Sequence, residues 1–102
     1  MVVAEISIIP IGTGAPSVSR YVAAAVAELE ASGLRCTLHP MGTTIEAESS
    51  GPVYAALARA QEAAFEAGLQ RVYTVVKMDE RRDEAGDRSA EDMVRSVRGS
   101  DS

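Results

Sequence analysis

One stretch near the middle of the chain alternates residue by residue between two kinds of side chain. It runs from Thr43 to Glu48, directly after Pro40–Gly42, whose residues favour a turn. As a strand, it places Thr44, Glu46 and Glu48 on one face and the residues between them on the other. A hydroxyl and two carboxylates together suit a small, polar, cationic ligand. A face that is simply exposed to water produces the same pattern, so both interpretations stay open.

A second stretch near the start of the chain has a matching polar face. Val2 to Ile11 is rich in β-branched residues and predicts a strand. Glu5 and Ser7 share one face with Val3 and Ile9, and the residues between them form an apolar face. The two stretches can therefore build one site if they pair in a sheet.

The remaining pattern predicts the elements that must position these strands. In chain order we expect a strand over 2–11, a helix capped by Ser17 and ended by Gly33, strands over 34–39 and 43–48, a helix ended by Gly68, a strand over 69–78 and a short helix from Ser89 to Val97. This βαββαβ order favours a ferredoxin-like α+β fold: a four-stranded antiparallel sheet with two helices on one face, plus a short C-terminal helix. Right-handed crossovers place the first and third strands side by side in the centre. Their polar residues are then neighbours on the face without helices.

Hydrophobic side chains on that same face predict self-association. They are Val3, Ile9, Tyr73 and Val75. An exposed sheet face of this kind favours a second subunit packed against it, sheet to sheet. The polar pocket would then lie in or beside the subunit interface.

Composition excludes several classes of partner. The chain has 102 residues, enough for one domain, which we expect over 1–98 with a frayed terminus over 99–102. Its net charge of −5 argues against nucleic acid and against anionic membranes. No apolar run approaches the roughly 20 residues that cross a bilayer. The first residues lack the basic region of a signal peptide, and a cytoplasmic location is the default expectation.

Catalysis finds little support in the sequence. Cys36 is the single cysteine and His39 the single histidine, so neither a zinc site nor a Cys/His pair is expected. Glu5 and Glu46 could raise each other's pKa as neighbouring like charges and resemble an acid/base pair. Without a nucleophile, a metal-binding set or a cofactor loop, we expect no catalytic residues, no metal and no cofactor.

Several motifs taken together resemble one known family. They are Met41-Gly42-Thr43-Thr44-Ile45-Glu46, Arg71-Val72, the run from Val76 to Asp83, Ile9 to Gly12, and Ser17 to Val22. This combination, which spans residues 2–98, resembles the MTH1187/YkoF-like family of thiamine-binding domains (DUF77). The chain departs from the family pattern at Ala47, where Gly is usual, and at Met78, where Ile is common.

The resemblance implies a ligand and an assembly. It implies non-catalytic binding of thiamine or its hydroxymethylpyrimidine part in the cytoplasm, and homodimers or homotetramers built sheet to sheet. A carboxylate suits the thiazolium cation, hydroxyls suit the aminopyrimidine edge, and an aromatic ring can stack on the ligand. The ligand-binding residues expected on this basis are Glu5, Ser7, Thr43, Thr44, Glu46 and Tyr73.

Two alternatives remain at this stage. The alternation points Thr43 towards the helices, so a structural role suits this residue as well as a ligand contact.

The topology is also shared by ACT-like effector-sensing modules. A sensing module, or a purely structural homo-oligomer without thiamine binding, is therefore the competing hypothesis.

Overall fold

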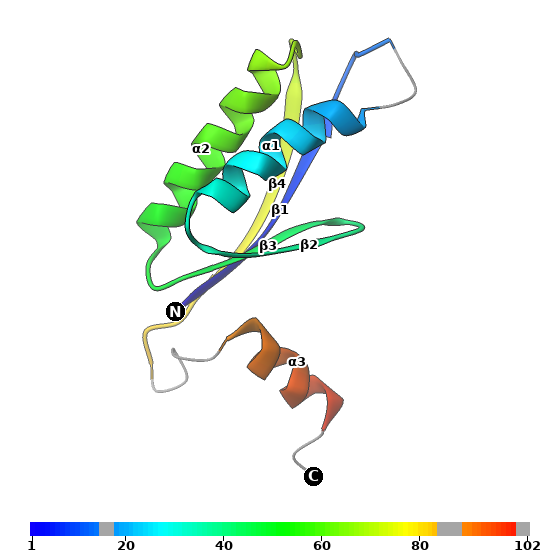
Figure 1. Cartoon of the computed structure of the whole chain (residues 1–102). Coiled ribbons are helices and arrows are strands. Elements are labelled where there is room, and N and C mark those ends of the chain that lie inside the picture. Colours follow the sequence, from blue (N-terminus) through cyan, green and yellow to red (C-terminus); the bar gives the residue numbers. More distant parts are fainter. Residues whose placement is uncertain (15–17, 84–88, 100–102) are drawn as a thin grey trace.

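The fold was obtained as a computed structural model, which describes residues 1–14, 18–83 and 89–99. Figure 1 shows the arrangement of its elements. In chain order these are β1 (Val2–Pro10), α1 (Ser19–Ala31), β2 (Arg35–His39), β3 (Gly42–Ala47), α2 (Ser50–Glu66), β4 (Val72–Glu80) and α3 (Ala90–Arg98). The predicted βαββαβ order with an additional C-terminal helix is confirmed. The expected helix cap at Ser17 lies outside the described residues.

The four strands form one antiparallel sheet in the order β2-β3-β1-β4. As predicted, β1 and β3 are central neighbours, and their register pairs Glu5 with Thr44 and Val3 with Glu46. Helices α1 and α2 pack against each other and cover one face of the sheet (Figure 1). We call the other face the open face.

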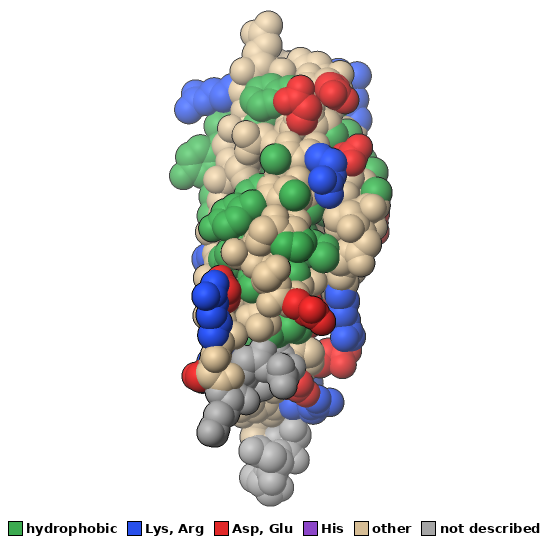
Figure 2. Space-filling model, turned by 90° about the vertical axis from the view of Figure 1, so that its left-hand side faces the viewer, with side chains coloured by type: hydrophobic (Ala, Val, Ile, Leu, Met, Phe, Trp, Pro, Cys, Tyr) green, Lys and Arg blue, Asp and Glu red, His purple; other side chains and the backbone are tan. Residues whose placement is uncertain are grey.

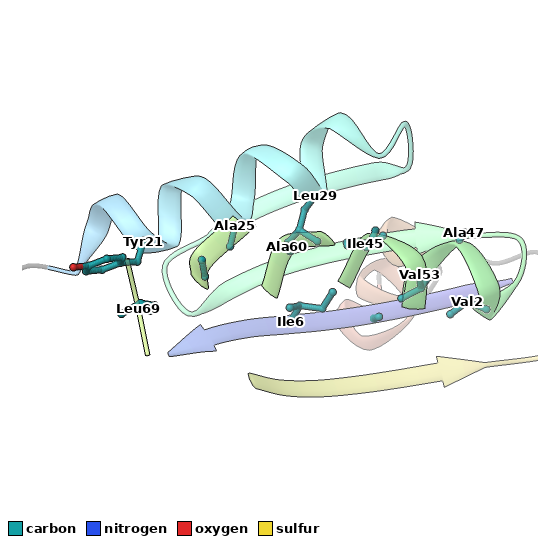
Figure 3. Close-up of a cluster of buried hydrophobic side chains, with 13 residues drawn as sticks. Val2, Ile6, Tyr21, Ala25, Leu29, Ile45, Ala47, Val53, Ala60 and Leu69 are labelled. Atoms are coloured by element: carbon teal, nitrogen blue, oxygen red, sulfur yellow. The ribbon is translucent and has the colours of Figure 1, made fainter. Parts of the chain in front are cut away.

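The core lies between this helix pair and the sheet, because each element buries the face that its periodicity predicts. In β1, Val2, Ala4 and Ile6 are buried, whereas the residues between them are partly exposed. In α1, Tyr21, Ala25 and Leu29 recur at helical spacing and point to the same core (Figure 3). The buried alanines of α2, at positions 56, 60 and 64, let this helix approach the sheet closely.

The last strand of the sheet begins and ends later than expected. Leu69 was expected in this strand but precedes β4, and it is buried at the Tyr21 end of the core (Figure 3). The strand then continues to Glu80 because each of its residues pairs with β1, down to the pair of Glu80 with Val2. Long-range pairing, rather than the local apolar pattern, sets these boundaries.

Helix α3 lies apart from the helix pair, beyond the end of the sheet at which the chain begins (Figure 1). It starts with a capping box: Ser89 Oγ accepts from the Asp92 N–H, and the Asp92 carboxylate accepts from the Ser89 N–H. Its position helps to make the molecule elongated, with extents of 50 × 27 × 19 Å. Figure 2 shows this outline from the side on which α2 lies, with hydrophobic side chains between charged groups of both signs.

Candidate functional site

The register of the sheet brings polar side chains from all four strands into one row across the open face. Thr37 of β2 pairs with Thr44 of β3, Thr44 pairs with Glu5 of β1, and Glu5 pairs with Lys77 of β4. We call Thr37, Thr44, Glu5 and Lys77 the polar row. Glu5 and Thr44, both expected from the sequence to be site residues, are direct cross-strand neighbours within it.

Glu5 is the carboxylate in the centre of the open face that remains accessible. Its side chain is 41% exposed, and its Oε2 lies 3.7 Å from Nε2 of His39. Gly42 stands opposite His39 on β3, so no side chain separates the imidazole from Glu5. Glu5 can therefore meet a positively charged group that approaches the face, with the His39 imidazole beside it.

Ser7 lies beside Glu5 but is already engaged. Its hydroxyl donates a hydrogen bond of 2.9 Å to the carbonyl of Met41, at the turn between β2 and β3. The hydroxyl oxygen keeps acceptor capacity while its proton is used to hold the hairpin to β1. Ser7 therefore positions the turn next to the polar row.

Glu46 does not lie on an open polar surface, as the sequence pattern suggested, but beneath the first turn of α3. Its side chain is 6% exposed. Its Oε1 accepts the Ala90 N–H at 2.9 Å, and its Oε2 lies 3.4 Å from Nε of Arg35. The carboxylate thus satisfies a backbone donor that a helix start leaves without an intrahelical partner. It also meets the positive end of the helix dipole.

Thr43 and Tyr73 lie outside the polar row. Thr43 is 2% exposed and faces the helices, as alternation requires, so it does not reach the open face. Tyr73 is on the open face and 54% exposed, but it pairs with Ile9 at the far end of β1. Lys77 is four positions further along the strand, a distance of about 13 Å. We call Ile9, Tyr73 and Val75 the apolar patch.

A cavity of about 490 Å³ separates α3 from the adjacent part of the open face. We call it the wedge. Its lining residues are Arg35, Thr37, Thr44, Glu46, Ala90, Glu91, Val94, Arg95 and Arg98. Sequence reasoning missed its arginines and Val94. The amphipathic pattern from Ser89 to Val97 was the signal that α3 must cover something, but it did not say what.

Among the described residues, no group of three or more His, Cys, Asp or Glu side chains is placed to hold a metal ion. Burial, and secondarily the charge of Glu30, raises the pKa of the Cys36 thiol, which keeps it protonated and a poor nucleophile. No helix within the described ranges has the length and apolar character to cross a membrane.

Comparison with known families shows to which family the chain belongs. A family model described as thiamine-binding protein matches residues 4–98. The chain belongs to this family. The resemblance that the motifs suggested is thereby confirmed. The family model covers nearly the whole chain.

One relative matches nearly the whole chain in sequence, and two solved structures match it in fold. A UPF0045 protein of Methanothermobacter thermautotrophicus is 45% identical over 98 residues, which cover 96% of this chain and 97% of that protein. A solved structure from Methanocaldococcus jannaschii is 32% identical with a TM-score of 0.82 and covers 94% of each chain. A Thermotoga maritima protein described under thiamine biosynthesis and salvage is 17% identical with a TM-score of 0.75, covers 94% of this chain and 97% of that chain, and supports the fold alone.

Proposed function

We propose that this chain is a non-catalytic binding protein for thiamine or its hydroxymethylpyrimidine part. Membership of the thiamine-binding protein family supports a small-molecule ligand of this kind. The observation that carries the site is the polar row, in which the accessible carboxylate of Glu5 stands beside the hydroxyl of Thr44. We place the ligand on this row, at or near a sheet-to-sheet interface of a homodimer or homotetramer.

The chemistry of the polar row matches the two ends of thiamine. The Glu5 carboxylate attracts the thiazolium cation, and this attraction strengthens when a second subunit removes water from the face. The hydroxyls of Thr44 and Thr37 can donate to and accept from the aminopyrimidine edge. In this proposal Glu46 acts indirectly, by holding α3 beside the row. Ser7 holds the hairpin, and Tyr73 belongs to the surrounding interface.

Substitution of Glu5 separates the charge contribution from the rest of the site. In Glu5→Gln the cation attraction is lost, so we expect thiamine to bind about tenfold more weakly, equivalent to about 1.4 kcal/mol. The uncharged hydroxymethylpyrimidine should lose much less affinity. Isothermal titration calorimetry with both compounds measures the difference. Glu62→Gln on α2, exposed and away from the open face, is the matched control.

Two results would count against this assignment. Absence of both binding heat and thermal shift at millimolar thiamine and millimolar hydroxymethylpyrimidine would remove the proposed ligand class. Equal weakening of both compounds by Glu5→Gln would show that the carboxylate does not contact the cation.

A second candidate is a structural or effector-sensing homo-oligomer without thiamine binding. The exposed apolar patch favours it, because such a surface is suited to a protein partner whether or not a ligand is bound. A stable oligomer that shows no response to either compound would support this candidate instead.

A further inference from the structure

Helix α3 carries an apolar stripe that is accessible to solvent along most of its length. Ala90, Met93, Val94 and Val97 recur at spacings of three and four residues and so share one side of the helix. We call these four residues the α3 stripe. None of the nine residues of α3, all of which the structure describes, is buried. Val94 is 51% and Val97 89% exposed.

The helix is attached to the sheet near its first turn. Besides the Ala90 N–H bond to Glu46, Nη2 of Arg35 lies 3.2 Å from Oε1 of Glu91. Val94 and later residues line the wedge instead of filling it. A nine-residue helix is marginally stable by itself, and most helical stability in proteins comes from packing of an apolar face. The α3 stripe therefore requires a covering surface.

The apolar patch is a second uncovered surface, at the opposite end of the same face. Ile9 is 42%, Tyr73 54% and Val75 37% exposed. The register places Glu46, the anchor of α3, opposite Val3 at the start of β1, whereas Ile9 pairs with Tyr73 near its end. Val3 and Ile9 are six positions apart along β1, a distance of about 20 Å.

We propose that a second copy of this chain covers both surfaces, with the α3 stripe of each copy packed on the apolar patch of the other. A two-fold axis that lies between two stacked open faces and crosses their strands exchanges the two ends of the face. Because α3 is anchored over β2 and β3 whereas the apolar patch lies on β1 and β4, the axis must pass near the polar row and run obliquely to the strands, which brings each stripe onto the other patch. The arrangement rests on the sheet-to-sheet pairing proposed above and adds a role for α3: it is an intersubunit arm, and each wedge is closed by the partner copy.

The size of the open face is compatible with such a dimer. Two strands of nine residues and two of five and six residues, spaced about 4.8 Å apart, give a projected area on the order of 450 Å². The nine residues of α3 add about 13 Å of helix beside the face. Because side chains project from the sheet, the accessible area of the face is larger than its projected area. It therefore approaches the roughly 800 Å² per partner that is typical of stable interfaces.

The charges of the face also permit self-pairing. The polar row, which would lie near the axis, holds Glu5 and Lys77 as direct neighbours. Groups near a two-fold axis face their own copies, and each Glu5 carboxylate there has the Lys77 ammonium group as a cross-strand neighbour, which reduces the repulsion between the two carboxylates. A partner of strongly acidic or basic surface has no comparable match here.

Sedimentation equilibrium of the full chain and of Val97→Asp tests the arm. We expect the wild type to associate and Val97→Asp to weaken association at least tenfold, because a carboxylate would be buried against the apolar patch. Ser96→Asp adds the same charge to the polar side of α3 and should leave association unchanged. Circular dichroism must show equal folding of all three proteins.

Disulfide trapping between copies tests the geometry. In a Cys36→Ser background, mixing Val97→Cys with Tyr73→Cys should produce a cross-linked heterodimer, whereas Val97→Cys alone should remain largely uncross-linked. Self-cross-linking of Val97→Cys would overturn the proposed axis. A monomeric wild type, or association that Val97→Asp leaves intact, would overturn the arm. Thiamine titration of the same samples distinguishes failure of the arm from failure of the proposed function. If thiamine binds although the arm tests fail, only the arm is refuted.

Discussion

Replacing Glu46 with alanine is expected to release α3 from the sheet while the core stays folded. The carboxylate is 6% exposed and joins two parts of the chain that are 44 residues apart. Without it, the Ala90 N–H loses its acceptor and Arg35 loses one of its two carboxylate partners, while Glu91 remains. Water can replace part of what Arg35 loses, because its side chain is 57% exposed.

The magnitude follows from these contacts. A hydrogen bond from a backbone donor to a charged acceptor contributes about 1.5–3 kcal/mol, and the exposed ion pair with Arg35 contributes at most about 1 kcal/mol. We therefore expect the docking of α3 to weaken by about 2 kcal/mol. Glu46→Gln, which keeps an acceptor oxygen but loses the charge, should cost about 1 kcal/mol, chiefly the helix-dipole contribution.

Amide hydrogen exchange measures the opening of α3 separately from global unfolding. A 2 kcal/mol loss corresponds to an increase of roughly 30-fold in the exchange rates of α3 amides, while the amides of the buried segment of α1 around Leu29 should keep their protection. Glu48→Ala, two residues further on and exposed, is the control that should change neither. Unchanged exchange of α3 in Glu46→Ala would refute the conclusion that this carboxylate anchors the helix.

Two further predictions concern the hairpin and the thiol. Gly42→Ala should destabilise the protein by about 2 kcal/mol, because φ is +156° and an added Cβ would lie 2.7 Å from the carbonyl oxygen of Ile6. Thermal unfolding should show a melting temperature lower by roughly 10 °C. The control Gly51→Ala, in open space within α2, should be neutral or stabilising. The raised pKa of Cys36 predicts that iodoacetamide alkylates the folded protein at higher pH than the urea-unfolded chain, and that Glu30→Gln moves the folded profile part of the way back. Coincident profiles for folded and unfolded protein would contradict the second prediction.

Much of the fold follows from local patterns in the sequence. Alternation in β1 separates Ala4 and Ile6 from Glu5, and helical spacing in α1 selects Ala25 and Leu29 as core residues. Both patterns report directly which side of an element is apolar, and burial of that side is the main driving force for folding. With few topologies compatible with the element order, the central pairing of β1 with β3 could also be predicted.

The candidate site could be predicted only in part. The pairing of Glu5 with Thr44 follows from strand order and alternation. The alternation also excluded Thr43 from the open face, although the family motif had suggested it as a ligand contact. The bond from Ser7 to the Met41 carbonyl depends on how the hairpin turn closes over β1, a contact across 34 residues that no local pattern contains.

By itself, the sequence determined the order of the elements, the faces of the strands and membership of the thiamine-binding protein family. Only the tertiary structure decided the surroundings of Glu46. The pattern placed it with the other polar groups of the open face, but the first turn of α3 covers it. The physical reason is that an amphipathic pattern specifies which side of a helix must be covered, not which surface covers it. That choice depends on contacts between residues far apart in the sequence, such as the bond from the Ala90 N–H to Glu46. It determines that Glu5, rather than Glu46, is the central carboxylate of the open face left accessible to a ligand.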